Sequence, residues 1–137
     1  MPRLSRALGW ATAALMALAS ALGLLFPELY RDPDWVLAAW SGNDVVTLVV
    51  AVPVLVTGLV MSRRGSRTGE LLVYASCAYA IYGYAYYLFG ASLNVLLPVY
   101  VALVVVPLLG LSIGLGTLDT PALAGEFGPR TSKRFAA

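Results

Sequence analysis

The sequence contains no histidine, and its single cysteine, Cys77, lies inside an apolar segment. One cysteine cannot form a disulfide within the chain. Without histidine, the chain lacks the usual ligands for haem and zinc and cannot form a Ser-His-Asp triad. We therefore expect no catalytic residues, no metal site and no cofactor, and we interpret the protein as non-enzymatic.

Charged residues are also scarce, because they make up only 12% of the 137 residues while apolar residues make up 60%. Soluble domains carry roughly 25% charged residues, so this composition indicates a protein whose solvent is the lipid bilayer. A net charge of +2, divided among several loops, does not favour nucleic-acid binding. The excess of arginine over lysine, with much alanine, glycine and valine, is typical of bacteria with GC-rich genomes.

A helix needs about 20 apolar residues to cross a bilayer, and four apolar stretches of this sequence approach or reach that length. They predict an all-α fold, an integral membrane four-helix bundle that forms one domain over residues 1–118. The predicted spans cover residues 7–26, 45–61, 71–89 and 93–116. Residues 119–137 are predicted to be a disordered cytoplasmic tail. We also expect a separate surface helix over residues 33–40 that lays Trp35 and Trp40 into the membrane interface.

Arginine and lysine alternate between the two sides of these four spans. The N-terminus, the second loop and the tail carry eight of them, whereas the first loop carries only Arg31 and the third loop none. Short loops rich in these residues stay in the cytoplasm, so both termini are predicted to be cytoplasmic and the protein to lie in the bacterial inner membrane. Alternatively, residues 1–21 form a cleaved signal peptide ending in ALASA, although the apolar run continues to Phe26.

Six tyrosines lie within the segment YASCAYAIYGYAYYLFG, residues 74–90. One face of this helix is predicted to be a packing seam against a neighbouring helix, because small and aromatic residues alternate along it at seven-residue intervals. The alternative is that its hydroxyl groups line a cavity. Gly83 is expected at the helix contact, whereas Tyr84, Tyr86 and Tyr87 lie in the outer third of the span, where aromatic rings favour the membrane interface. The candidate seam or cavity residues are Ser76, Tyr79, Tyr82, Gly83 and Tyr86.

A second group of polar residues lies at the predicted outer boundary. Asn43 and Asp44 open the second span, Thr47 follows one turn later, and Asn94 opens the fourth span. The simplest interpretation is that Asn43 or Asp44, and likewise Asn94, cap helix N-termini. The alternative is that Asp44 lies at membrane depth and binds an ion or a proton.

The segments WSGNDVVTL, RRGSR and YAIYGYAYYLFGASLN resemble a family of uncharacterised polytopic membrane proteins of bacteria, over roughly residues 40–105. Members of this family have no assigned activity, so the resemblance implies a multi-pass membrane protein and gives no catalytic residue. Many members are longer and have further spans after the fourth, which implies that residues 119–137 replace those spans here.

Taken with the composition, these patterns predict a multi-pass membrane protein that acts as a non-enzymatic accessory or scaffold protein. Its expected partners are the lipid bilayer and either a second copy of the chain or another membrane protein, but not nucleic acid. The alternative function is a small transporter or channel, in which tyrosine and threonine hydroxyl groups line a path for a neutral or cationic solute.

Overall fold

The computed structural model describes residues 1–118, and these residues form helices joined by short connections, with no strand among them. The prediction of an all-α fold is therefore confirmed for this part of the chain, while the predicted tail lies outside it. The elements are α1 (Arg3–Leu25), η1 (Pro27–Leu29), α2 (Asp34–Val46), η2 (Thr47–Ala51), α3 (Val52–Arg63), α4 (Arg67–Gly90) and α5 (Leu97–Leu115). Because α2, η2 and α3 follow one another without a break, the bundle has four long helices.

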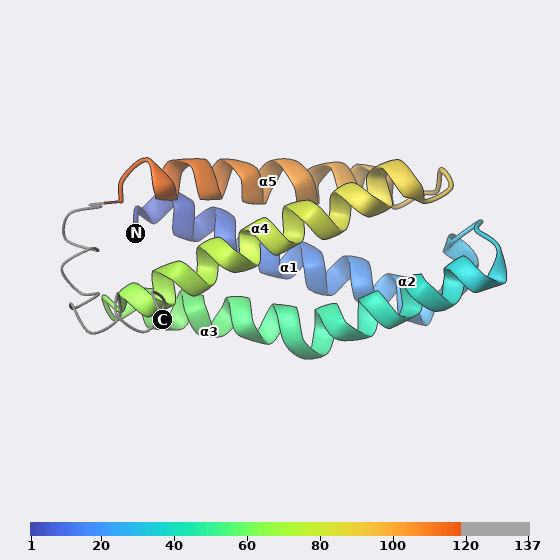
Figure 1. Ribbon diagram of the computed structural model, residues 1–137, viewed down its shortest axis with the longest axis horizontal. Coiled ribbons are helices and arrows are strands. Elements are labelled where there is room, and N and C mark those ends of the chain that lie inside the picture. The colour runs from blue at the N-terminus through green and yellow to red at the C-terminus, as the bar shows by residue number, and fades with distance from the viewer. Residues whose placement is uncertain (119–137) are drawn as a thin grey trace, which may run out of the picture.

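The four long helices lie side by side and run in alternating directions (Figure 1). α4 packs between α3 and α5, and α1 completes the bundle by packing against α5 and against the helix formed by α2 and α3. The N-terminus, the α3–α4 turn and the end of α5 lie at one end, which we call the N-terminal end. The connection between α1 and α2 and the loop between α4 and α5 lie at the other, the connector end.

Three of the four long helices are long and apolar enough to cross a membrane, namely Arg3–Leu25, Asp34–Arg63 and Leu97–Leu115. α4, which carries six tyrosines, is not among them. Tyrosine is amphipathic, so a helix rich in it has a lower mean hydropathy than one built from valine and leucine. The segment predicted as the third span is thus a helix of sufficient length that lacks the apolar character of the other three.

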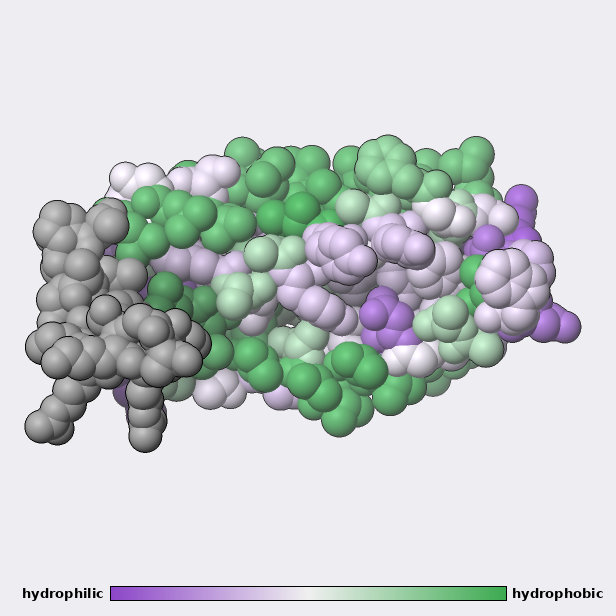
Figure 2. Space-filling view, viewed as in Figure 1, coloured by the Kyte–Doolittle hydropathy of each residue, from purple (hydrophilic) through white to green (hydrophobic). Residues whose placement is uncertain are grey.

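Apolar side chains cover the surface of the bundle while several polar side chains lie inside it. Val49 is 69% exposed and Leu108 is 48% exposed, whereas Thr12 and Ser20 are fully buried. Figure 2 shows hydrophobic side chains along most of the visible face, with a paler band over α4 and hydrophilic residues gathered at the connector end. A soluble helical bundle instead has charged and polar residues on its exposed face, while its apolar stripe forms the core, as it does here.

The second predicted span is part of a longer helix that begins at Asp34 and ends at Arg63. The expectation of a separate surface helix over residues 33–40 is therefore wrong. Trp40 is only 7% exposed, because its ring packs on that of Tyr87 with the centroids 4.4 Å apart. This packing holds α2 against the bundle. A single glycine such as Gly42 destabilises a helix by only about 1 kcal/mol, which is too little to interrupt the long helix.

A π-helical turn, η2, lies near the middle of this long helix and just before Pro53. The backbone N–H of Val52 donates to the carbonyl oxygen of Thr47, five residues earlier. Proline has no N–H group and its ring clashes with the preceding turn of a regular α-helix. The wider π turn accommodates Pro53 without ending the helix, and such turns are common beside functional residues.

Glycines allow α4 to approach both of its neighbours closely. A Cβ atom on Gly69 would lie 2.6 Å from both the Cβ atom of Met61 and the backbone nitrogen of Ser62 on α3. A Cβ atom on Gly114 of α5 would overlap with the ring of Tyr74. Both α4 interfaces therefore depend on the absence of a side chain at these two positions, as in other closely packed helix pairs.

Candidate functional site

The most unusual buried group in the bundle is the carboxylate of Asp44, which lies near the end of α2 and is 1% exposed. The hydroxyl group of Tyr30 donates to its Oδ2 atom at 2.7 Å, and the hydroxyl oxygen of Tyr87 lies 3.1 Å from its Oδ1 atom. No cation within residues 1–118 forms an ion pair with Asp44. Burying an unpaired carboxylate is costly, so these two hydroxyl groups are essential to its place in the core.

Tyr87 of α4 contacts three residues of α2, one of which is Asp44. Asn43 Nδ2 donates to its hydroxyl oxygen at 3.1 Å, and the same oxygen lies 3.2 Å from the carbonyl oxygen of Trp40. The Tyr87 hydroxyl group has one proton, which it can donate either to Asp44 or to the Trp40 carbonyl oxygen, but not to both. When Asp44 is ionised, Tyr87 donates to it. When Asp44 is protonated, it donates to Tyr87, which then donates to Trp40. The arrangement therefore accommodates either protonation state of Asp44.

Gly23 of α1 covers the hydrogen bond between Tyr30 and Asp44. A Cβ atom at this position would overlap with the Tyr30 hydroxyl oxygen and with Asp44 Oδ2, and would lie 3.0 Å from Tyr30 Cζ. Burial raises the pKa of the Tyr30 hydroxyl group, and its hydrogen bond to Asp44 raises it further. Tyr30 therefore keeps its proton and acts as the donor to Asp44.

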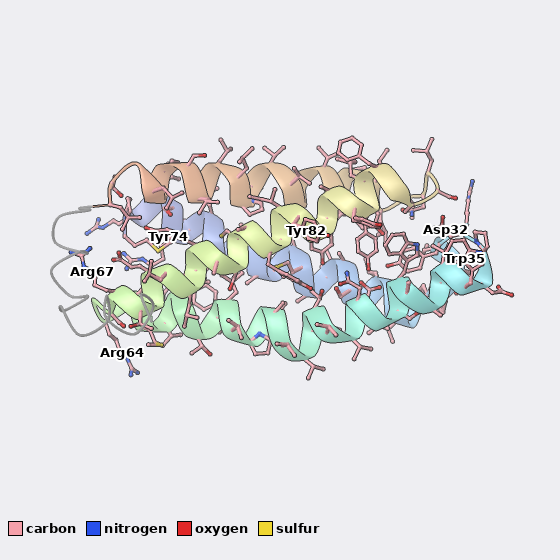
Figure 3. All side chains as sticks on the ribbon, in the orientation of Figure 1. Asp32, Trp35, Arg64, Arg67, Tyr74 and Tyr82 are labelled. Carbon is pink, nitrogen blue, oxygen red and sulfur yellow. The ribbon has the colours of Figure 1, made fainter. Side chains whose placement is uncertain are left out.

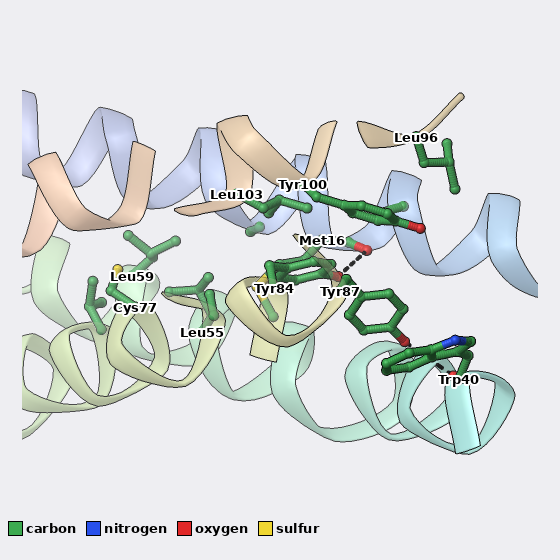
Figure 4. Close-up of a cluster of buried hydrophobic side chains, with 14 of the residues drawn as sticks. Met16, Trp40, Leu55, Leu59, Cys77, Tyr84, Tyr87, Leu96, Tyr100 and Leu103 are labelled. Atoms are coloured by element: carbon green, nitrogen blue, oxygen red, sulfur yellow. Dashed lines mark hydrogen bonds between the residues drawn. The ribbon is translucent and has the colours of Figure 1, made fainter. Parts of the chain in front are cut away.

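Stacked aromatic rings fill the space between this network and the rest of the core (Figure 4). The ring of Tyr87 lies 5.6 Å from that of Tyr84 and 5.2 Å from that of Tyr100, centroid to centroid. The Tyr84 hydroxyl group lies 3.4 Å from the hydroxyl oxygen of Ser20 on α1. The Tyr100 hydroxyl group is buried beside the Tyr30 hydroxyl group and the Asn94 side chain. Asp44, Tyr30, Tyr84, Tyr87 and Tyr100 form the aspartate–tyrosine cluster, to which α2, α4, α5 and the connection between α1 and α2 contribute.

The predicted outer-boundary residues take different places. Asn43 and Asp44 join the cluster through Tyr87, whereas the Thr47 hydroxyl oxygen lies 3.4 Å from that of Tyr79, outside the cluster. The interpretation of Asn43 or Asp44 as an N-cap is wrong, because α2 begins well before them, at Asp34. Asn94 lies in the loop before α5, beside Tyr100. Its side chain accepts a hydrogen bond from the Leu96 backbone at 2.9 Å and turns the chain into α5 without capping the helix itself.

The predicted packing seam on α4 does not contact another helix of the described chain along most of its length. Tyr82 is 72% exposed and Tyr86 is 63% exposed, and nothing lies within 4 Å of a Cβ atom built on Gly83. Only Ser76, at the margin of the seam, is buried, and Tyr79 is half-buried. The expectation that Gly83 faces a neighbouring helix within the chain is therefore wrong.

The face of α4 that does enter the core carries two of the three tyrosines that were expected at the membrane interface. Tyr84 is 3% exposed and Tyr87 is 2% exposed. They continue a stripe of buried residues spaced alternately by three and four positions, which is the spacing of helix packing. This stripe consists of Val73, Cys77, Ala80, Tyr84 and Tyr87.

The exposed seam residues border a shallow pocket instead. Tyr82, Gly83 and Tyr86 of α4 line it together with Asn43 of α2, and its volume is about 220 Å³. Figure 3 shows where Tyr82 lies on α4 in the face toward the viewer. Tyr87 also lines this pocket, so the pocket ends at a residue that contacts Asp44 directly.

The aspartate–tyrosine cluster has the groups needed to hold a proton, a small cation or a polar solute, but not those of a transition-metal site. No group of three histidine, cysteine, aspartate or glutamate residues lies together within residues 1–118. No family model, curated protein or solved structure matches this chain. The resemblance to polytopic bacterial membrane proteins stays a prediction, and the site is interpreted from its geometry.

Proposed function

We propose that the chain is a multi-pass integral membrane protein that crosses the bilayer four times, with both termini in the cytoplasm, and that it acts as a non-enzymatic accessory or scaffold protein. The observation that carries this proposal is the apolar surface around a core that contains Thr12, Ser20 and Asp44. In lipid, an exposed valine costs nothing, and polar groups are stable only where they bond to one another.

The lengths of the helices agree with this proposal. At 1.5 Å per residue, the 23 residues of α1 extend about 34 Å, and the 24 residues of α4 extend about 36 Å. Both lengths exceed the thickness of the hydrocarbon core, which is about 30 Å. Although α4 is less apolar, the other three helices shield its buried tyrosines, and its exposed Tyr82 and Tyr86 lie in the second half of the helix.

The first test is the topology of the protein in bacterial cells. A Cys77→Ser background would carry either Arg31→Cys, in the connection between α1 and α2, or Arg64→Cys, in the α3–α4 turn. A membrane-impermeant maleimide should label Arg31→Cys in intact spheroplasts and should label Arg64→Cys only after permeabilisation. Extraction of the protein by carbonate at high pH, or the reverse labelling pattern, would contradict the proposal.

A second candidate function, a small transporter or channel for a neutral or cationic solute, is favoured by one observation. The pocket beside Tyr82 and Gly83 extends to Tyr87, which contacts the buried Asp44. An Asp–Tyr site at the end of an accessible pocket is a reasonable binding site for a cation or proton within a membrane protein.

Flux measurements on purified protein in liposomes distinguish the two functions. A transporter should move a cation or a small polar solute, and both Asp44→Asn and Tyr82→Leu should lower the rate. An accessory or scaffold protein should give no flux above that of empty liposomes. Val49→Leu, at an exposed position away from the pocket, serves as the matched control and should behave as the parent does.

A further inference from the structure

A second polar site lies at the N-terminal end of the bundle, far from the aspartate–tyrosine cluster along α1. Arg3, Arg6, Ala7 and Trp10 of α1 and Arg63 of α3 line an open pocket of about 430 Å³. The guanidinium group of Arg63 lies over the Trp10 ring, 5.1 Å from its centroid. We call this site the arginine pocket.

The three arginines of this pocket have no carboxylate partner within residues 1–118. The ion pairs in this part of the chain connect Glu70 to the Met1 amine and to Arg67, so Glu70 is already engaged. The first turn of α1 also carries no acidic residue that would complement its helix dipole. Three guanidinium groups around one pocket repel each other unless an anion lies between them.

The chemistry of these groups selects a phosphate. Each guanidinium group presents parallel N–H donors that match two phosphate oxygens, and such charge-assisted bonds are stronger than neutral ones. Arg63 is also held in place by the ring of Trp10, so less of its side-chain freedom remains to be lost on binding. We propose that the arginine pocket binds a phosphate ester, and that its source is the headgroup of an anionic phospholipid.

The surroundings favour a lipid over a soluble phosphate ester. This step depends on the proposed membrane insertion, in which the pocket lies at the cytoplasmic surface of the bilayer. On the pocket face of α1, the residues one and two turns beyond Trp10 are Ala14 and Ala17, and Val60 of α3 is 39% exposed one turn from Arg63. Acyl chains could lie along this apolar face while the headgroup occupies the pocket. Basic pockets between membrane helices on the cytoplasmic side commonly bind such headgroups.

The test compares Arg63→Gln with Arg64→Gln, because the two arginines are neighbours in sequence and only Arg63 lines the pocket. The parent and both variants would be purified in a neutral detergent and titrated with phosphatidylglycerol, with phosphatidylcholine and with glycerol 3-phosphate. Native mass spectrometry counts bound lipid, and the midpoint of thermal unfolding reports binding of all three ligands. Circular dichroism confirms that each variant remains helical.

The parent should bind phosphatidylglycerol more tightly than phosphatidylcholine. Arg63→Gln should weaken phosphatidylglycerol binding by about tenfold or more, because it removes charge-assisted hydrogen bonds, whereas Arg64→Gln should leave it nearly unchanged. A triple Arg3→Gln, Arg6→Gln, Arg63→Gln variant should lose the preference for the anionic lipid. Equal binding of the two lipids by the parent, or equal affinities of Arg63→Gln and Arg64→Gln, would overturn the proposal.

The glycerol 3-phosphate arm separates the two sources of phosphate and separates this inference from the proposed function. Stabilisation by glycerol 3-phosphate without a preference for phosphatidylglycerol would support a phosphate site and overturn the lipid source. A protein that carbonate extracts from membranes, yet binds glycerol 3-phosphate through Arg63, would overturn membrane insertion and leave the phosphate site standing. An inserted protein whose lipid binding does not depend on Arg63 would overturn the arginine pocket alone.

Discussion

Replacing Gly23 by alanine tests whether the aspartate–tyrosine cluster holds the connector end of the bundle together. The added methyl group would overlap with the Tyr30 hydroxyl oxygen and with Asp44 Oδ2, so one of these side chains must move. Neither has an easy alternative position, because Asp44 is 1% exposed and Tyr30 is 5% exposed. We therefore expect the hydrogen bond between them to break or lengthen.

The magnitude follows from three contributions. Alanine in place of glycine stabilises a helix interior by up to about 1 kcal/mol, but Gly23 lies in the last turn of α1, where this gain is smaller. Overpacking a core typically costs about 1–3 kcal/mol. A disturbed hydrogen bond to a buried carboxylate costs a further ~1.5–3 kcal/mol, which is the range for hydrogen bonds to charged groups. With about 0.5 kcal/mol regained from helix propensity, the net loss in the free energy of unfolding should therefore be about 2–5.5 kcal/mol.

Gly83→Ala is the matched control, because Gly83 is also a glycine in a long helix but a Cβ atom at its position would have nothing within 4 Å. This variant should be more stable than the parent by about 0.5–1 kcal/mol, since only helix propensity changes. Unfolding in mixed micelles with increasing dodecyl sulfate, followed by circular dichroism, measures both. If Gly23→Ala proves as stable as Gly83→Ala, the packing of Gly23 on the Tyr30–Asp44 bond is not what holds α1 in place.

Three further predictions test other parts of the bundle. Tyr87→Phe should lower the free energy of unfolding by about 1–3 kcal/mol because Asp44 loses a buried hydrogen-bond partner. Tyr82→Phe, at an exposed position, should be nearly neutral. Similar losses for the two variants in the same unfolding assay would contradict the role of the cluster. Gly114→Ala should cost about 1–3 kcal/mol because its methyl group displaces an aromatic ring of α4, and an unchanged midpoint would rule out that contact. Cys77, which is 2% exposed, should react with a small maleimide only on unfolding, and labelling of the folded protein in detergent would contradict its burial.

The four long helices and their approximate positions followed from the sequence because apolar runs of about 20 residues have few alternatives to a helix. The continuity of α2 with α3 could not be predicted in the same way. Ser41, Gly42 and Asn43 are residues that commonly mark the start or the end of a helix, and Pro53 is a helix breaker in water. Packing of Trp40 on Tyr87 and the π turn before Pro53 outweigh those local preferences.

The buried face of α4 was ambiguous in the sequence for a physical reason. Two stripes on this helix have the same alternating three- and four-residue spacing, one through Tyr79 and Gly83 and the other through Ala80 and Tyr84. They are one residue out of step, which rotates the face by about 100° on an α-helix. Both stripes contain small residues and tyrosines, so spacing alone could not select the one that packs. The hydrogen-bonding partners of Tyr84 and Tyr87, on α1 and α2, favour the second stripe.

The polar residues at the outer boundary were identified as candidates, but their partners were not. Asp44 was noted because a carboxylate at the edge of an apolar run is unusual, and the structure joins it to Tyr30 and Tyr87. Tyr30 was missed, although it is the only tyrosine outside the predicted spans. Its contact with Asp44 depends on how η1 returns the chain toward the bundle, which no periodic pattern encodes.

The two polar sites involve the same pair of helices at opposite ends. At the connector end, Gly23 of α1 packs on Asp44 of α2, and at the N-terminal end Arg63 of α3 lies over Trp10 of α1. Between these sites the two helices contribute apolar residues to the core, such as Ala13 and Met16 of α1 and Leu55 of α3. In a bilayer, apolar contacts alone do not fix how one helix is positioned along another, because lipid chains offer similar contacts. The polar and aromatic groups at the two ends therefore specify the register of α1 against α2 and α3.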